Sequence, residues 1–125
     1  MHRVGTRAFL PSDSADQRYA AIFEDDGQTG YFYGAQYSEP GSKDFSILDA
    51  LHVYNVASVV DKEAIYPIEI LWWPDRRRVG LFIERRCHAI FDFDVNRAIC
   101  RTGFPPASGN FTNSHAWDES LVPMR

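Results

Sequence analysis

Alternation of hydrophobic and polar positions, the pattern typical of β-strands, recurs along most of this chain. Residues 19–23 and 31–37 alternate in this way on either side of a loop, 24–30, that contains two glycines and three acidic residues. We expect the two segments to pair as a hairpin. One face of its second strand is lined by Tyr31, Tyr33, Ala35 and Tyr37.

Two more hairpins are expected in the second half of the chain. The first joins 68–73 to 79–84, with Pro74 ending its first strand, and the second joins 87–93 to 98–102. In the latter, the positions expected to face the core are Cys87, Ala89, Phe91 and Phe93. Trp72 and Trp73 point to opposite faces, so either one is exposed as a binding anchor or a two-layer fold buries both.

The remaining segments are less regular. Phe45, Leu48 and Leu51 lie three residues apart, which predicts a short helix beginning at Ser42 and leading into a strand. Residues 1–18 contain Pro11 and lack periodicity, which predicts a loosely ordered N-terminal arm. The single domain then covers residues 19–118, with a possible helical turn around Trp117, and 119–125 form a C-terminal tail.

The predicted fold is therefore mainly β, a β-rich α+β class. We expect an antiparallel sheet or a small sandwich of consecutive hairpins, with one or two short helices. A length of 125 residues fits one domain, and an aromatic content of 14% supplies large apolar side chains for its core.

Charge and apolar runs limit the classes of function. The net charge is −4, with −6 in residues 1–70 and +2 in residues 71–125, which argues against duplex nucleic acid as a ligand. An RNA-binding sheet is a weaker alternative, because no signature of that class is present. There is no secretory signal and no apolar run of about 20 residues, so we expect a soluble, cytoplasmic protein with Cys87 and Cys100 reduced.

Standard catalytic and cofactor signatures are missing from the sequence. It has no phosphate-binding loop, dinucleotide fingerprint, nucleophile elbow or paired C-x-x-C motif. Residues 92–96 begin like a calcium loop, but Arg97 replaces the required glycine and Gly103 the closing glutamate. We therefore predict a polar turn there, and no metal site or cofactor.

Several short blocks resemble a bacterial family of unknown function. They are FEDDGQTGYFY (23–33), ILDALHVYNV (47–56), HAIFDF (88–93), CRTGFP (100–105) and HAW (115–117). The resemblance extends over roughly residues 19–118. It implies a small bacterial cytosolic protein of the size and composition of the immunity proteins that neutralise toxins, and it assigns no activity, cofactor or catalytic residue.

The leading hypothesis is a non-catalytic protein-binding module, of which an immunity protein is one form. A short acidic chain without catalytic signatures is suited to rapid association with a basic protein. The expected contact residues lie in and beside the first hairpin loop: Glu24, Asp25, Asp26, Tyr31 and Tyr33.

The alternative is a small-molecule-binding protein or a small hydrolase. Its pocket would be lined by Asp49, His52, Tyr54, His88, Asp92, Arg101 and Trp117. In this hypothesis His52 or His88 is the general base and Arg101 binds an anion. Convergence of these three residues on one cleft would favour it, and their separation would count against it.

Overall fold

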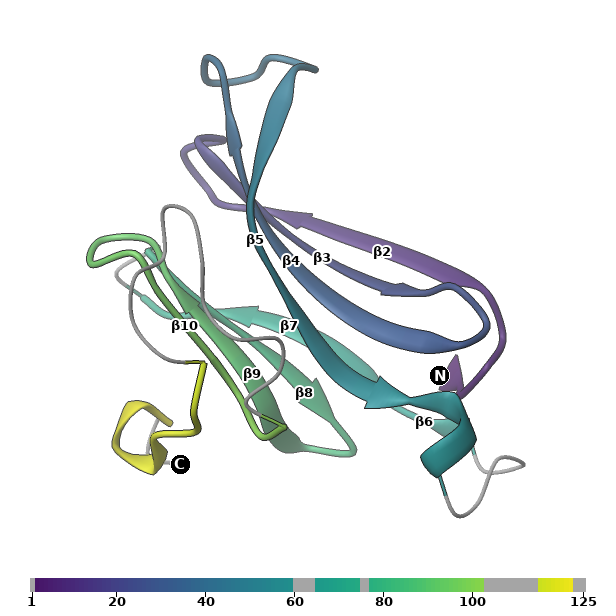
Figure 1. Ribbon diagram of the computed structural model, residues 1–125. Helices are drawn as coiled ribbons and strands as arrows, with labels where there is room; N and C mark the ends of the chain where they lie inside the picture. The colour runs from purple at the N-terminus through teal and green to yellow at the C-terminus, as the bar shows by residue number, and fades with distance from the viewer. Residues whose placement is uncertain (1, 60–64, 75–76, 103–114, 123–125) are drawn as a thin grey trace.

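The computed structural model describes residues 2–59, 65–74, 77–102 and 115–122. They form a β-sandwich of two four-stranded antiparallel sheets, together with one short strand pair (Figure 1). Strands that are adjacent within each sheet are also consecutive in the chain. The prediction of a mainly β fold of consecutive hairpins is confirmed.

The first sheet has the order β2 (Ala8–Asp13), β3 (Tyr19–Asp25), β4 (Thr29–Tyr37) and β5 (Phe45–Asn55). The second has the order β10 (Arg97–Cys100), β9 (Arg86–Asp92), β8 (Arg78–Ile83) and β7 (Ile68–Trp72). A pair formed by β1 (His2–Arg3) and β6 (Ile65–Tyr66) lies at one end of the sandwich (Figure 1). The short 3-10 turns are η1 (Val56–Ser58) and η2 (Glu119–Leu121). In the described ranges, no helix is long and apolar enough to cross a membrane.

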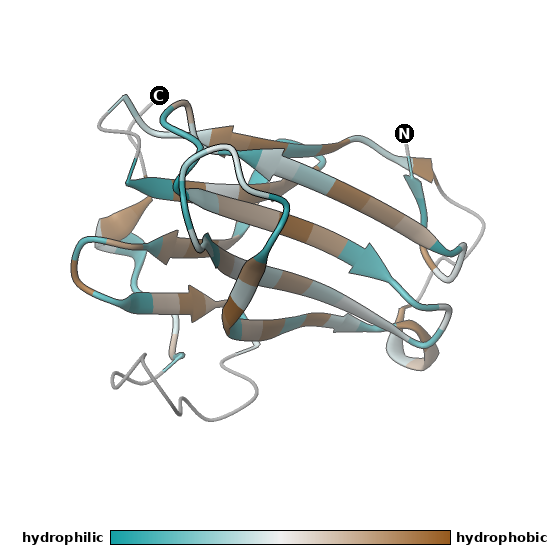
Figure 2. Cartoon of the chain, turned by 90° about the horizontal axis from the view of Figure 1, so that it is seen from above, coloured by the Kyte–Doolittle hydropathy of each residue, from teal (hydrophilic) through white to brown (hydrophobic). Residues whose placement is uncertain are grey.

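The main core lies between the two sheets. Phe23, Phe32 and Leu51 of the first sheet pack with Leu81 and Phe91 of the second. The alternation that buries one face of each strand is visible as changing hydropathy along the strands in Figure 2. The rings of Phe32 and Phe91 lie 5.1 Å apart, so the two layers are in direct aromatic contact.

A second apolar cluster covers the other face of the second sheet. Ile90 and Ile99 are buried there under Trp117, which belongs to the C-terminal segment 115–122. Trp73 packs on this cluster, whereas Trp72 packs on the main core. Of the two interpretations of the tryptophan pair, the structure supports the two-layer fold, in which neither ring is fully exposed.

The helix predicted after Ser42 is wrong, because this segment belongs to the strand β5. The register shifts between β4 and β5 at Gly34/Ala35, where Asp49 pairs with Gly34 and Ile47 with Ala35. Leu48 is therefore the extra residue of a β-bulge. The bulge brings Leu48 and Leu51 to the same face although they are three residues apart, which imitates helical spacing.

The N-terminal segment also differs from the prediction. Residues expected to form a loose arm include β1 and β2, and β2 pairs with β3 along its whole length. Pro11 is tolerated because β2 is an edge strand, where one side of the backbone needs no ladder hydrogen bond.

A bulge in β9 changes the predicted core face of that strand. Ala89 pairs with Leu81, but Cys87 pairs with Phe82, so His88 has no partner in the register. Cys87 consequently packs in the cluster under Trp117 and not in the main core. Neither Cys87 nor Cys100 is part of a disulfide, and both are buried.

Candidate functional site

The face of the first sheet that points away from the main core, here called the outer face, carries most of the predicted contact residues. The register pairs Phe9 with Glu24 and Glu24 with Tyr31. Tyr31 in turn pairs with His52, so one row of side chains crosses all four strands. The next row consists of Pro11, Ile22, Tyr33 and Ala50.

Two tyrosines form the centre of the outer face. The rings of Tyr31 and Tyr33 are stacked with centroids 5.5 Å apart, and His52 meets Tyr31 edge-on at 4.8 Å. The Tyr33 hydroxyl donates a 2.9 Å hydrogen bond to Glu24 Oε1. Burial and the Glu24 carboxylate raise the pKa of Tyr33, so the hydroxyl stays protonated and the ring is held in place.

Large apolar side chains are exposed around these tyrosines. Phe9 in the first row is 62% exposed, and Ile47 and Phe45 on β5 are 50% and 48% exposed. The Tyr37 hydroxyl donates a 2.5 Å hydrogen bond to Asp13 Oδ1 on β2, so the Tyr37 side chain extends from β4 over β3. Such a grouping of exposed apolar and aromatic side chains is typical of an interaction surface.

Asp26 lies in the loop that adjoins the outer face. Its Oδ1 accepts hydrogen bonds from the backbone N–H groups of Thr29 and Gln28, both 2.9 Å long. These bonds lower the pKa of Asp26 and fix the β3–β4 turn. The carboxylate is thus ionised and held beside the first row.

Asp25 does not belong to this surface, contrary to the prediction. It is 1% exposed, because β3 extends two residues beyond its predicted end and alternation turns Asp25 toward the core side. Its carboxylate accepts hydrogen bonds from Tyr54 (2.6 Å), His2 (3.0 Å), Gly5 (2.8 Å) and Gly27 (2.8 Å). Burial raises the pKa of Asp25, but these hydrogen bonds outweigh it and lower the pKa overall.

The cluster around Asp25 fixes the N-terminus to the sandwich. Besides its contact with Asp25, His2 Nε2 lies 3.0 Å from the Tyr54 hydroxyl. Gly30 lies directly beneath the Tyr54 ring, where a Cβ atom would come within 2.5 Å of the ring carbon Cζ. His2 was missed by sequence reasoning, because nothing in the sequence marks this residue within a segment without periodicity.

The residues predicted to line a catalytic pocket do not converge on one cleft. His52 lies on the outer face, whereas His88 and Tyr54 line a cavity at the end of the sandwich. The Arg101 backbone N–H donates to the His88 carbonyl at 3.1 Å. The Arg101 guanidinium, however, packs 4.1 Å from the centre of the Trp117 ring, and its Nε donates to the Cys87 carbonyl at 2.6 Å. Arg101 does not line the cavity that contains His88, so this set does not place a general base and an anion-binding arginine in one cavity.

The last two predicted pocket residues have local partners. Asp92 lies at the β9–β10 turn and accepts a hydrogen bond from the Asp94 N–H at 3.0 Å, as expected for a polar turn. Asp49 contacts the buried His115, with Asp49 Oδ2 2.6 Å from His115 Nε2. This contact ties the C-terminal segment to β5.

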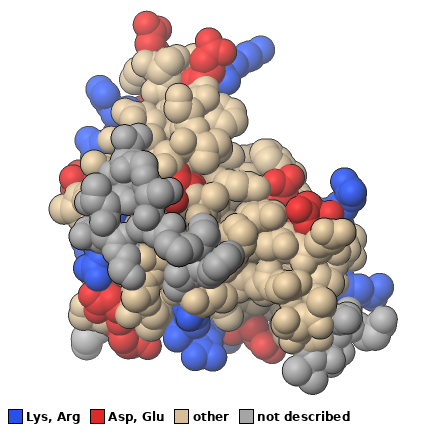
Figure 3. All heavy atoms as spheres, viewed as in Figure 1, with Lys and Arg blue, Asp and Glu red and all other residues tan. Residues whose placement is uncertain are grey.

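Figure 3 shows how charge is distributed on one face of the molecule. On the face shown in Figure 3, acidic and basic side chains lie mixed along much of the edge, and most of the described surface between them is uncharged. In the described part of the chain, no three His, Cys, Asp or Glu residues gather in a group that could hold a metal ion.

Comparison with known proteins identifies relatives but no activity. The model of the family described as "Uncharacterized protein conserved in bacteria (DUF2251)" matches residues 2–124. A protein of Haemophilus influenzae, described only as uncharacterized, is 39% identical over 77 residues, which are 62% of this chain and 46% of that protein. No solved structure gives a significant match. The chain therefore belongs to this uncharacterised, conserved bacterial family.

Proposed function

We propose that this protein is a non-catalytic protein-binding module that uses its outer face to bind a partner with a basic surface. The observation that carries the proposal is that four of the five predicted contact residues lie together. Glu24, Tyr31 and Tyr33 share the outer face, and Asp26 adjoins it. By contrast, the residues predicted for the alternative are not gathered in one cleft, because Tyr54 and His88 line one cavity and His52 lines another with Tyr54.

Aromatic side chains supply the contact area in this proposal. Tyrosine buries a large, rigid surface with few rotatable bonds, and residues of this type dominate the binding energy of many interfaces. The hydrogen bond from Tyr33 to Glu24 and the stacking on Tyr31 hold both rings before any partner arrives. Preorganisation of this kind reduces the entropy cost of association.

Charge supports a basic partner. Residues 2–59, which include the whole first sheet, contain eight acidic and four basic residues. Acidic residues remain in excess when Asp25 and Asp49, which are held in the hydrogen-bonded contacts described above, are left out. An excess of one sign increases the association rate with a partner of the opposite sign and makes that rate sensitive to salt. A basic toxin neutralised by an immunity protein is one such partner.

The test is site-specific crosslinking in the native bacterium. The photoreactive amino acid p-benzoylphenylalanine is incorporated at position 9, where the native Phe is 62% exposed on the outer face. The control carries it at position 95, because Val95 is 61% exposed in the turn after β9. We expect a single basic protein to be crosslinked from position 9 and not from position 95.

Variants then test the assignment of the surface with the isolated partner. Tyr31→Ala is expected to weaken binding about tenfold or more, whereas Val95→Ala leaves it unchanged. Raising the salt concentration should slow association of the wild-type protein. Equal crosslinking from both positions, or none from position 9, contradicts the proposal.

A further inference from the structure

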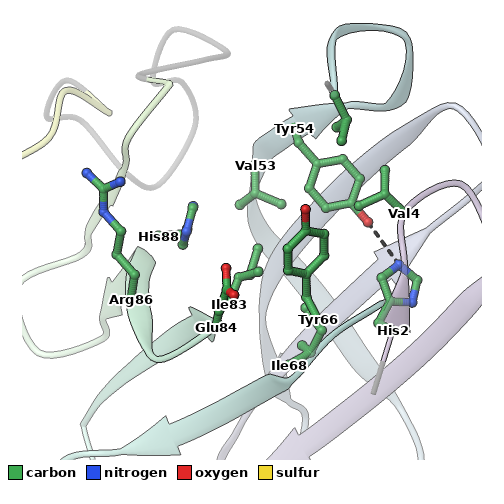
Figure 4. Close-up of a pocket in the computed structure, with 11 residues that line it drawn as sticks. His2, Val4, Val53, Tyr54, Tyr66, Ile68, Ile83, Glu84, Arg86 and His88 are labelled. Atoms are coloured by element: carbon green, nitrogen blue, oxygen red, sulfur yellow. Dashed lines mark hydrogen bonds between the residues drawn. The ribbon is translucent and has the colours of Figure 1, made fainter. Parts of the chain in front are cut away.

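A cavity of about 370 Å³ opens at the end of the sandwich, beside β1 and β6 (Figure 4). This volume falls within the range of about 300–1,000 Å³ that is usual for small-molecule sites. Its walls are apolar and come from both sheets and from the segments between them: Val4, Val53, Val59, Ile68 and Ile83. The rings of His2 and Tyr54 complete the wall, and their polar atoms are already engaged with Asp25.

The polar lining groups that do not bind Asp25 lie on the side of the cavity nearer the second sheet. Arg86 and His88 project from β9, and the Glu84 carboxylate lies between them and the Tyr66 ring (Figure 4). The β9 bulge is what turns His88 toward the cavity. Within the residues that the structure describes, the side chains of Arg86 and His88 form no ion pair or hydrogen bond with other protein groups.

Positive charges act on His88 at this end of the cavity, where the acidic Glu84 also lies. Burial, together with the positive charges of Arg101 and Arg86, lowers the pKa of His88 to about 4. At neutral pH the imidazole is therefore uncharged and offers one N–H donor and one acceptor. Arg86 adds a charged guanidinium whose geometry suits a carboxylate.

The turn between β8 and β9, next to the cavity, has a backbone conformation that is unfavourable for the residues it contains. Glu84 and Arg85 form the two-residue turn between β8 and β9, with φ of 52° and 66°. Two consecutive left-handed residues are typical of a type I′ turn, which favours Asn-Gly because side chains are strained there. Strained backbone of this kind is more frequent at binding sites than elsewhere.

We propose that this cavity binds a small monocarboxylate with an apolar body. The carboxylate accepts hydrogen bonds from Arg86 and His88, and the apolar body lies against the valine and isoleucine walls. Glu84, on the same rim, repels a second negative charge, which selects a monocarboxylate over a dicarboxylate. The site is separate from the outer face, so this inference and the proposed protein-binding function can fail independently.

The experiment uses octanoate as the probe and follows it by NMR of the full chain. Octanoate should give saturable shifts of the cavity residues and should raise the pKa of His88, because the anion stabilises the imidazolium. 1-Octanol, which has the same tail without the charge, should bind about tenfold more weakly, since it forms no charge-assisted hydrogen bond. Suberate, the dicarboxylate of the same length, should also bind more weakly than octanoate.

Three charge-removing variants test which residues act on the bound carboxylate. Arg86→Gln should weaken octanoate binding about tenfold and leave 1-octanol unaffected. Arg85→Gln, the matched control, removes the same charge from the adjacent residue, which does not line the cavity, and should change little. Glu84→Gln should tighten octanoate binding, because it removes a repulsive charge.

The following results would contradict binding of a monocarboxylate in this cavity. It is wrong if octanoate at millimolar concentration gives no saturable shifts of the cavity residues, or if octanoate and 1-octanol bind equally. It is also wrong if Arg85→Gln and Arg86→Gln weaken binding by the same factor, because the effect would then be one of overall charge. Val59→Trp, which fills the cavity from a half-buried wall position, should abolish binding of both probes, and retained binding contradicts the location.

Discussion

At the scale of single residues, Gly30 permits the contact on which the N-terminal cluster depends. A Cβ atom here would lie 2.5 Å from Tyr54 Cζ, so Gly30→Ala must displace the Tyr54 ring from Asp25. We expect the free energy of unfolding to fall by about 2–3 kcal/mol, the combined cost of overpacking and of a weakened hydrogen bond to a buried carboxylate. Urea denaturation measures this free energy of unfolding, and Gln28→Ala, at an exposed position, is the control. Equal stabilities of the two variants would refute the steric argument.

His88 predicts a pH dependence of stability. Its pKa is about 4 in the folded chain against an ordinary value of 6.5, so the unfolded chain takes up a proton first as pH falls. The contribution of His88 is therefore complete above pH about 6.5 and is lost as the pH falls toward about 4. We expect a loss of about 1–3 kcal/mol over that window, reduced by partial exposure of the side chain.

The measurement for His88 is urea denaturation at pH 7 and pH 4.5 for the wild type and for His88→Asn. The variant lacks the titrating group and should lose less stability between the two pH values. The same loss in both proteins would show that other groups cause it.

Single residues also show how far sequence reasoning reaches. Alternation correctly placed Tyr31 and Tyr33 on one face, because a strand has a fixed period of two. The same rule would have turned Asp25 inward, but the first strand of the hairpin was predicted to end at residue 23, while β3 ends at Asp25. The error was one of strand length.

At the scale of elements, the three hairpins were predicted because each has two alternating segments around a polar turn. The helix at 42–51 was wrong because the β5 bulge at Leu48 changes the phase of the alternation, and a bulge leaves no clear signal in one sequence. The edge strand β2 was missed for a related reason. Its residues pack on one side only, so Pro11 and its polar neighbours imitate a loop.

The C-terminal segment is an element whose attachment can be tested. His115 contacts Asp49 at 2.6 Å, and the Arg97 guanidinium donates to Asp118 at 3.0 Å. His115→Phe keeps an aromatic ring but leaves Asp49 without this partner, which should cost about 1–3 kcal/mol. Hydrogen exchange should show the loss of protection mainly in 115–122, and an even loss over both sheets would contradict a local role for the contact.

At the scale of the whole molecule, the two sheets differ in how they are covered. The C-terminal segment packs on the outer side of the second sheet over Ile90 and Ile99, whereas Phe9, Phe45 and Ile47 remain exposed on the first sheet. The arrangement of the two sheets also explains why the predicted pocket residues are not gathered in one cleft. Hairpin patterns specify neighbours within a sheet, but they do not specify how two sheets face each other, which decides whether His52, His88 and Arg101 meet.

The edge position of Pro11 has a consequence for the behaviour of the protein at high concentration. An exposed edge strand offers unpaired backbone groups to a strand of another molecule, and this is a common route to aggregation. Proline lacks the N–H group that such an added strand would need, and Asp13 at the end of β2 adds a charge. The imino acid that made this segment look like a loop thus protects the open side of the sheet from uncontrolled growth.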